Sequence, residues 1–324
     1  MANPTRAVIT LATTKMLYVD MAFTLARSFE YWNRRSGISF HIVTDLEIDL
    51  PADLRDVRLE RLSPGQLGRG FAPKLHLDSL APADQTLFID ADCLCLGPAK
   101  EIFDRFAGRP VSVVGGKISS GAWWGSIAVI RARTGVKSLP FFNGGLYYVE
   151  RCEAARKVYS RAREIEKQYD EWGLLRLRGH PNDEILMAIA MAEAGIEALP
   201  DDGSIMAAFN YYPQFLELNV FAGRCRIANP PPPHRLHTPN GPVRAVEPRF
   251  PHFVNTYTDH WRYRAEAKKL RLHSLSRWPR WLAGLFAWCA VSVPGALLVF
   301  ARDTLRPLYR ALFGVRAITP SKRV

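Results

Sequence analysis

The sequence has little of what marks exported or disulfide-stabilised proteins. Its 324 residues include five cysteines, an odd number without the Cys-x-x-Cys pairs of a zinc ribbon. So few cysteines do not form the framework of a secreted disulfide scaffold, and we expect a reducing compartment. Residues 1–6 lead into the strand-like segment 7–11 without the apolar stretch of a signal peptide, so we expect the body to remain in the cytoplasm.

Net charge is also nearly absent from most of the chain. The formal charge of +12 arises from 43 Lys and Arg against 31 Asp and Glu. Thirteen of the basic residues and only two of the acids lie from Arg262 onward, which leaves residues 1–261 close to neutral. A nucleic-acid-binding domain would carry a basic patch on its folded body. We therefore expect no nucleic-acid partner.

The chain contains no internal repeat, and its 48% hydrophobic content is sufficient for a full core. Short β-rich segments alternate with helical patterns over the first two hundred residues, which predicts an α/β sheet with helices on its faces. The predicted strands are 7–11, 39–43, 57–62, 86–89, 111–114 and 146–149. The predicted helices are 18–32, 74–80, 101–106, 153–169 and 183–194. The proline-rich stretch 229–251 is predicted to be a surface loop.

The C-terminal part differs in character. Residues 281–301 run for 21 residues without a charge, about the length that crosses a bilayer. Pro294-Gly295 would interrupt a helix there, and the arginines of residues 302–310 recur every four positions along a basic amphipathic helix. Because arginines flank the apolar run on both sides, we expect a re-entrant or interfacial hairpin with both ends in the cytoplasm. A buried helix pair packed on the body is the alternative.

Two aspartates follow the apolar segment 86–89 directly, as Asp90-Ala91-Asp92. If strand alternation continues, both carboxylates point to one face at the carboxyl edge of the sheet, where open α/β folds bind ligands. Two such carboxylates can hold Mg²⁺ or Mn²⁺, together with the phosphate oxygens of a ligand. Taken alone, the pair equally fits solvated carboxylates or a helix cap.

Four further segments accompany this pair in order along the chain. They are Val8–Thr14 with Tyr18 after it, Lys74-Leu75-His76, Phe142–Val149, and His252-Phe253-Val254-Asn255. Together with the aspartates they resemble the GT-A glycosyltransferases, most closely family 8 and the glycogenin-like group. The resemblance implies a GT-A, Rossmann-like mixed sheet flanked by helices over residues 1–261, with residues 262–324 as a membrane-associated tail.

The resemblance also implies roles for individual residues. The metal ligands would be Asp90, Asp92 and His252. The nucleotide and donor sugar would be contacted by Ala12, Thr13, Tyr18, Lys74, Asp90, Ala91, Asp92, Asn143, Gly144 and Gly145. The family's Asp-Gln pair has its counterpart in Asn182-Asp183, so Asn182, Asp183 and Lys74 are the candidate catalytic residues.

Two departures from the family pattern concern the diphosphate and the acceptor. The glycine and the diphosphate-binding lysine that follow the family's histidine are replaced here by Asn255 and Thr258, and Arg262, Arg264 or Lys268 are the candidate substitutes. In Asn182-Asp183, the carboxylate and the amide are exchanged relative to the family.

The expected function is metal-dependent transfer of a sugar, with retention of configuration, from a nucleotide sugar such as a UDP-sugar. The tail favours a lipid-linked or cell-envelope glycan acceptor at the cytoplasmic face of a membrane, taken to be a bacterial inner membrane. Trp123-Trp124 fits an acceptor-stacking or membrane-dipping loop and equally a buried aromatic pair. A sugar-nucleotidyltransferase is disfavoured because no glycine-rich phosphate loop follows the first strand. A catalytically silent, membrane-associated scaffold remains the alternative.

Overall fold

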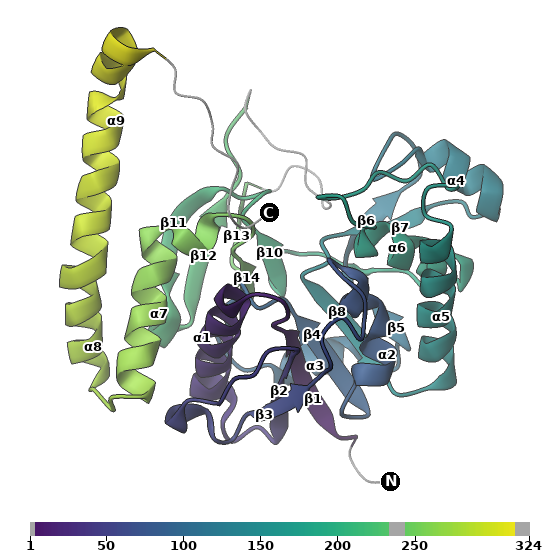
Figure 1. Ribbon diagram of the computed structural model, residues 1–324, viewed down its shortest axis with the longest axis horizontal. Helices are drawn as coiled ribbons and strands as arrows, with labels where there is room; N and C mark the ends of the chain where they lie inside the picture. The colour runs from purple at the N-terminus through teal and green to yellow at the C-terminus, as the bar shows by residue number, and fades with distance from the viewer. Residues whose placement is uncertain (1–3, 233–243, 315–324) are drawn as a thin grey trace.

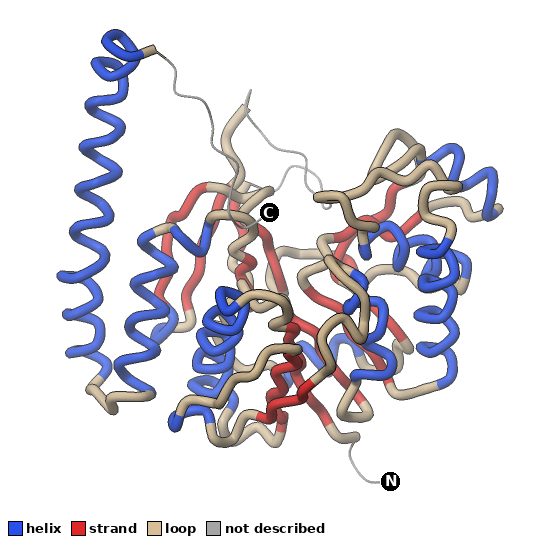
Figure 2. The backbone as a smooth tube through the Cα atoms, viewed as in Figure 1, coloured by secondary structure: helices blue, strands red, loops and turns tan. Residues whose placement is uncertain are grey.

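A mixed six-stranded sheet forms the centre of the molecule in the computed structural model, which describes residues 4–232 and 244–314 (Figures 1 and 2). Its strand order is β3-β2-β1-β4-β8-β5, in which β1 to β4 are parallel and β8 is antiparallel to both of its neighbours. The strands are β1 (Arg6–Leu11), β2 (Ile38–Thr44), β3 (Arg58–Arg61), β4 (Gln85–Ile89), β5 (Val111–Ser112) and β8 (Leu146–Glu150). The predicted α/β sheet is confirmed.

Helices cover both faces of this sheet, because the side chains of its strands alternate between two buried clusters. In β4, Leu87 and Ile89 pack with α1 and α3, whereas Phe88 packs with α5 and α6 on the opposite face. The helices concerned are α1 (Met16–Asn33), α2 (Leu77–Leu80), α3 (Lys100–Phe106), α5 (Glu153–Lys167) and α6 (Asp183–Glu193). The predicted helix 74–80 begins as a 3-10 turn, η2 (Ala72–His76), and becomes α-helical only in α2.

Smaller sheets extend the body beyond the central one. One contains β6 (Val114–Ile118), β7 (Leu139–Phe142) and β9 (Leu199–Pro200), with α4 (Ile127–Thr134) between β6 and β7. A second pairs β10 (Met206–Ala208) with β14 (Phe250–His252), and a third contains β11 (Gln214–Asn219), β12 (Arg224–Ala228) and β13 (Ala245–Val246). The remaining short 3-10 helices are η1 (Ala52–Leu54), η3 (Val220–Ala222) and η4 (Tyr257–Asp259).

Two sequence predictions for the body are wrong in part. The predicted strand 111–114 is divided, because β5 pairs with β8 in the central sheet while β6 pairs with β7 in another. The predicted loop 229–251 contains β13 and β14, although residues 233–243 within it lie outside the described part of the chain. Pro251 fits this strand because its carbonyl still accepts from the N–H of Leu94 at 3.3 Å, while the neighbouring Phe250 donates to the carbonyl of Ile205 at 2.8 Å.

The C-terminal part forms α7 (Trp261–Ser274) and then one long helix composed of α8 (Arg280–Ala287), the π-helical turn η5 (Trp288–Ser292) and α9 (Val293–Phe313). The predicted hairpin is wrong, because residues 280–313 form a continuous 34-residue helix. Pro294 stands in the first turn of α9, immediately after η5, and a wider turn is a usual way for a helix to accommodate proline.

Burial also contradicts the alternative of a buried helix pair. Only 11% of the most apolar window of this helix is buried, and by length and composition the helix could cross a membrane. The predicted boundary after residue 261 falls at the start of α7, whose Tyr263 and Leu270 join a buried cluster of the body. The division at that position stays a prediction, and residues 315–324 lie outside the described part of the chain.

Candidate active site

The two aspartates lie where β4 ends at the carboxyl edge of the central sheet. The backbone N–H of Asp90 donates to the carbonyl of Gly145 at 2.9 Å, and that of Cys93 donates to the carbonyl of Asp90 at 3.0 Å. The chain therefore turns after Ile89, and strand alternation does not continue through Asp90 and Asp92. The turn nevertheless directs both carboxylates to one partner.

That partner is His252, at the end of β14. Its Nε2 lies 3.0 Å from Asp92 Oδ1 and 3.6 Å from Asp90 Oδ2. The backbone fixes this meeting, because Cys93 and His252 form a β-bridge and the N–H of Phe253 donates to the carbonyl of Asp92 at 3.0 Å. The structure thus brings together all three predicted metal ligands, from positions 160 residues apart in the sequence.

Asn143 determines which nitrogen of His252 carries a proton. Its Oδ1 accepts from the backbone N–H of Gly145 at 3.1 Å, which establishes that the amide oxygen faces this side. The same Oδ1 lies 2.8 Å from His252 Nδ1, so Nδ1 must be the donor. In a neutral ring, Nε2 then presents a lone pair to the carboxylates of Asp90 and Asp92. Such a group of acceptors is stable only with a cation, either a proton on Nε2 or a metal ion.

The protonation equilibria agree with this demand for positive charge. Burial alone would lower the pKa of His252, but the carboxylates of Asp92 and Asp90 outweigh it and raise that pKa. Burial alone would raise the pKa of Asp92, but the charge of His252 and its hydrogen bond hold the pKa of that carboxyl below its usual value. Without a metal ion, the imidazolium form supplies the missing charge.

The donor set fits a divalent cation of the Mg²⁺ or Mn²⁺ type. Carboxylate oxygens of Asp90 and Asp92 with one imidazole suit Mn²⁺ in particular, since such ions keep further positions for water or phosphate oxygens. The Cys93 sulfur also lies within 4.8 Å of Asp92 and His252 ligand atoms. Burial keeps the pKa of this thiol well above its usual range, so it stays protonated and is a poor ligand for a hard ion.

Lys74 reaches the same cluster from η2. Its Nζ donates to Asp90 at 2.9 Å and to the carbonyl of Gly144 at 2.8 Å, and it lies 4.0 Å from Asp183. Burial would lower the pKa of Lys74, but Asp90 and Asp183 reverse this and raise it, so the amine stays charged. Lys74 is therefore a fixed positive charge beside the candidate metal ligands, and its contact with the donor stays a prediction.

Two residues of this cluster were not predicted from the sequence. Tyr147 donates its hydroxyl to Asp183 Oδ2 at 2.6 Å, and Glu184 accepts from the N–H of Gly144 at 2.8 Å and from Trp124 Nε1 at 2.9 Å. Burial and the neighbouring Asp183 raise the pKa of Glu184 to about 7. The sequence feature that could have indicated Glu184 is its place directly after Asp183, at the start of an apolar helix.

The Trp123-Trp124 alternatives are decided in part by these contacts. Trp123 packs edge-on against Phe141 and Phe142, with ring centroids 5.0 and 5.8 Å apart. Both tryptophans are half-buried against the cluster around α5 and α6. The pair therefore packs on the protein body, and Trp124 is joined to the candidate site by its hydrogen bond to Glu184.

The glycines of the Asn143-Gly144-Gly145 segment are required by side chains of the site. A Cβ at Gly145 would lie 2.4 Å from His252 Nδ1, and one at Gly144 would lie 2.7 Å from Asp183 Oδ2. Real Cβ atoms do not approach so closely. The family resemblance implies that Gly144 and Gly145 contact the donor, and this stays a prediction. The close neighbours that the structure shows are residues of the protein itself.

The predicted nucleotide contacts lie at the same sheet edge, beyond β1. Ala12 is fully buried and its N–H donates to the carbonyl of Val43 at 2.8 Å, so its backbone donor is already used. Thr13 and Tyr18 are half-buried before and within the first turn of α1. Ala91 is buried between the two aspartates. Because β1 and β4 are parallel, the residues that follow β1 and Asp90, which follows β4, lie at the same edge of the sheet.

Asn182 has a structural position at the start of α6. Its Oδ1 accepts from the N–H of Glu184 at 2.7 Å, which makes Asn182 the N-cap. Its Nδ2 is buried and has no hydrogen-bond partner among the described residues. Asp183 is 3% exposed, and burial raises its pKa even though Lys74 acts against this. The catalytic roles of Asn182 and Asp183 stay predictions.

The candidate substitutes for the missing diphosphate lysine, Arg262, Arg264 and Lys268, all lie on α7. The guanidinium of Arg262 is 4.8 Å from the Trp261 ring centroid, and the amine of Lys268 is 5.6 Å from that of Phe286. Their role toward a diphosphate stays a prediction. Another cation, which was not predicted, contacts the segment that follows His252. Arg178 donates to Asn255 Oδ1 at 2.7 Å, and Asn255 follows His252 by three residues.

Comparisons with known proteins were made at three levels. No protein-family model and no curated protein sequence matches the chain. Among solved structures, the glycosyltransferase GlyE of Streptococcus pneumoniae TIGR4 is similar at 16% identity with a TM-score of 0.41, covering 61% of this chain and 45% of that one. The chain therefore spans less than half the length of that GlyE chain.

Two further solved structures are similar over most of their own length. The galactosyltransferase LgtC, in complex with donor and acceptor sugar analogs, shares 13% identity with a TM-score of 0.46 and covers 75% of this chain and 86% of that one. Mouse xyloside xylosyltransferase 1, in its apo form, shares 12% identity with a TM-score of 0.41 over 63% of this chain and 87% of that one.

Proposed function

We propose that this chain is a metal-dependent glycosyltransferase that transfers a sugar from a nucleotide-sugar donor, a UDP-sugar, to a lipid-linked or cell-envelope glycan at the cytoplasmic face of a membrane. The observation that carries the proposal is the orientation of His252. Asn143 holds the proton on Nδ1, so Nε2 and the carboxylates of Asp90 and Asp92 form an acceptor-only group that binds a cation.

The reaction class follows from the charge that such a group can hold. Transfer from a nucleotide sugar breaks the bond between the anomeric carbon and a phosphate oxygen and leaves negative charge on a diphosphate. A divalent ion held by Asp90, Asp92 and His252 would act as a Lewis acid toward that diphosphate. Lys74, which is charged and buried beside Asp90, adds a second fixed positive charge.

The remaining residues position the reactants. Tyr147 and Lys74 hold the Asp183 carboxyl in place, and Asp183 is the candidate contact for the sugar or acceptor hydroxyls. Asn143, Gly144 and Gly145 bring the backbone close to this carboxyl and to His252. Such positioning is a large part of the acceleration in group transfer. Retention of configuration is carried over from the family resemblance alone.

The membrane part of the proposal is supported by the long apolar helix at the C-terminal end of the described chain. It has the length and composition of a membrane-associating segment, and large apolar side chains along it are exposed. A lipid-linked acceptor would be concentrated at the surface to which this helix holds the enzyme.

The experiment that tests the proposal is metal-dependent hydrolysis of a panel of UDP-sugars by the purified full chain. We expect turnover with Mn²⁺ by the wild type, loss of at least a hundredfold in Asp92→Ala, and no change in the control Asp20→Ala on the exposed side of α1. Equal turnover in the wild type and Asp92→Ala would contradict the proposal. Absence of turnover with every donor, despite Mn²⁺ binding, would favour the silent scaffold instead.

A further inference from the structure

The long C-terminal helix, residues 280–313 and hereafter the tail helix, meets α7 along a seam of small residues. Every fourth residue of its first half lies on the side turned toward the body: Ala283, Ala287, Val291, Gly295 and Val299. Ala283 and Ala287 are fully buried, and a Cβ at Gly295 would lie only 2.3 Å from Trp261 Cβ. Small residues at such spacing allow two helices to approach closely.

Specific contacts hold this seam together at its start. The Phe286 ring lies edge-on to Trp278, with centroids 5.6 Å apart, and Lys268 of α7 places its amine 5.6 Å from the same ring. Arg280 donates to the hydroxyl of Tyr31 on α1 at 3.1 Å. The tail helix is therefore joined to the body at its N-terminal end.

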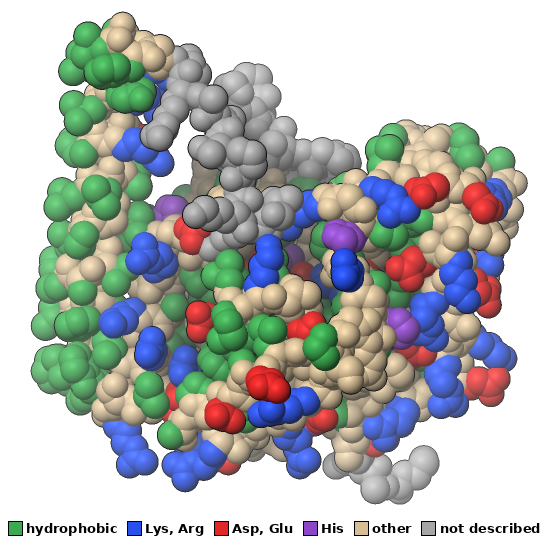
Figure 3. Space-filling view, viewed as in Figure 1, with side chains coloured by type: hydrophobic (Ala, Val, Ile, Leu, Met, Phe, Trp, Pro, Cys, Tyr) green, Lys and Arg blue, Asp and Glu red, His purple; other side chains and the backbone are tan. Residues whose placement is uncertain are grey.

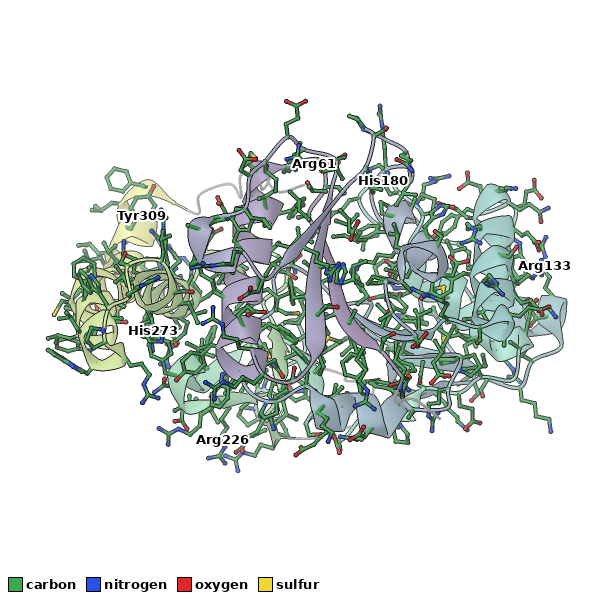
Figure 4. The ribbon with its side chains drawn as sticks, turned by 90° about the horizontal axis from the view of Figure 1, so that it is seen from below. Arg61, Arg133, His180, Arg226, His273 and Tyr309 are labelled. Atoms are coloured by element: carbon green, nitrogen blue, oxygen red, sulfur yellow. The ribbon has the colours of Figure 1, made fainter. Side chains whose placement is uncertain are left out.

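The opposite side of the tail helix is apolar and open. Trp281 is 71% exposed, Leu298 72% and Phe300 69%. Hydrophobic side chains follow one another along this edge of the molecule in Figure 3, and Tyr309 lies at its outer margin in Figure 4. The other exposed large apolar residues of the tail helix, apart from Phe286 at the seam, are Leu285, Trp288, Leu297, Leu305, Leu308, Leu312 and Phe313. A continuous patch of this kind marks an interaction surface.

Charge identifies the partner that fits this surface. Between residues 262 and 314, ten Lys and Arg residues accompany two acids. Arginine is present both before the apolar segment, at Arg277 and Arg280, and after it, at Arg302, Arg306 and Arg310. Arg302 and Arg306 share one acid, Asp303, so the flanks keep a net positive charge. Apolar side chains with such flanks are complementary to an anionic lipid surface, where each basic residue contributes about 1 kcal/mol.

We infer that the tail helix lies in the plane of an anionic membrane surface on its exposed apolar side, with α7 and the body above it, and does not cross the bilayer. The inference rests on the membrane association in the proposed function and adds the orientation. A crossing helix would have to leave α7, or bring the charged side chains of α7 such as Arg264 and Lys268 into hydrocarbon. In the plane, the seam with α7 is kept.

This orientation has a consequence for the candidate site. The tail helix runs in the same direction as β1 and extends past the carboxyl edge of the central sheet, where Asp90 and His252 lie (Figure 1). The site then opens along the membrane surface, so the acceptor is presented from the lipid headgroup region.

A disulfide across the seam tests the inference. We would prepare Trp261→Cys/Val299→Cys, whose positions line one pocket across the seam, in a Cys152→Ser/Cys289→Ser background in which the remaining Cys93, Cys95 and Cys225 are buried. The control pair is Trp261→Cys/Leu312→Cys, whose second cysteine is about 20 Å farther along the helix. We expect the first pair alone to cross-link under oxidation, equally with and without vesicles of phosphatidylcholine and phosphatidylglycerol. The cross-linked protein should float with those vesicles as the reduced protein does, and at least tenfold less with phosphatidylcholine alone.

Three results would overturn the inference. Cross-linking that fails on vesicles, or that abolishes flotation, means that the tail helix leaves α7 to cross the bilayer. Stable dimers without flotation mean that a second copy of the chain covers the apolar side. Tryptophan fluorescence gives an independent check with brominated lipids as quenchers. Trp281 and Trp288 should be quenched more by lipids that carry bromine near the headgroup than by lipids that carry it near the ends of the acyl chains. Hydrolysis of UDP-sugar by the same samples reports on the proposed function separately.

Discussion

At the scale of single residues, the candidate site depends on hydrogen bonds that fix a histidine. His252 is useful to a metal ion only when Nε2 is free of its proton, and Asn143 favours this by accepting from Nδ1. Partners of this kind, which touch a ligand residue rather than the ion, commonly change metal affinity by about 10- to 100-fold. The sequence suggested Asn143 as a sugar contact, and its role toward His252 became visible only in three dimensions.

Replacement of Asn143 tests this role directly. We expect Asn143→Ala to weaken Mn²⁺ binding by roughly 10- to 100-fold, because the ring of His252 loses its orientation. Asn143→Asp keeps an acceptor at the same place and should bind Mn²⁺ better than Asn143→Ala does. Titration calorimetry with Mn²⁺ measures both, and equal affinities for the two variants would show that the hydrogen bond to Nδ1 has no influence.

A second residue, Glu184, makes stability depend on pH. Its pKa is about 7 in the folded protein and near 4.5 in the unfolded chain, so the folded state binds more protons between these values. The sign is therefore opposite to that of an ordinary paired carboxylate: Glu184 costs stability as pH rises from about 4.5 to about 7. The cost is at most about 3.5 kcal/mol, from about 1.4 kcal/mol per pKa unit.

Glu184→Gln should remove this pH dependence. The free energy of unfolding of the variant minus that of the wild type should be about 1 to 3 kcal/mol larger at pH 8 than at pH 5. The lost hydrogen bond to Trp124 changes this difference equally at both pH values. Urea unfolding at the two pH values provides the free energies. If the difference between variant and wild type is the same at both, the Glu184 carboxyl is not titrating in this range.

At the scale of elements, the strands and helices of the central sheet were predictable because each carries a clear pattern. β1, β2, β4 and β8 coincide with predicted strands, and their apolar runs are buried on both faces. The short strands β10 and β14 were not predictable. They have three residues each, β14 includes Pro251, and they exist because long-range pairing brings them together. His252 could be assigned to the site only through the family resemblance for this reason.

The segment between β7 and β8 offers a prediction at this scale. Gly145→Ala places a methyl group 2.4 Å from His252 Nδ1, so the ring or the segment must shift. We expect Mn²⁺-dependent hydrolysis to fall at least tenfold, with a stability loss of about 1 to 3 kcal/mol from overpacking. Gly284→Ala, in α8, has no atom within 4 Å of the added Cβ and is the matched control. Full activity in Gly145→Ala would mean that His252 need not keep its observed position.

At the scale of the whole molecule, the body and the tail helix differ in what holds them in place. The body has buried clusters on both faces of its sheet, whereas the tail helix contacts it along one side. The sequence predicted an apolar, basic C-terminal part. It could not predict the continuous helix, because the effect of Pro294 depends on the π-helical turn before it and on the packing of Gly295 against Trp261.

Deletion of residues 278–324 separates the two parts functionally. We expect the truncated protein to retain donor hydrolysis within about threefold of the full chain, because all candidate site residues, including Arg262, Arg264 and Lys268, precede the deleted segment. Flotation with anionic vesicles and transfer to a lipid-linked acceptor should be lost. Transfer that is unchanged by the deletion would contradict the proposed link between the tail and the acceptor.

The central claim is that Asp90, Asp92 and His252 together hold a divalent ion. Pulsed electron paramagnetic resonance on Mn²⁺ bound to the protein with UDP measures this most directly, because it detects nitrogen coordinated to the ion. We predict one histidine nitrogen coupling in the wild type, unchanged in His180→Ala and absent in His252→Ala. A spectrum of Mn²⁺ that shows no nitrogen coupling in the wild type, or the same coupling in His252→Ala, would contradict the account.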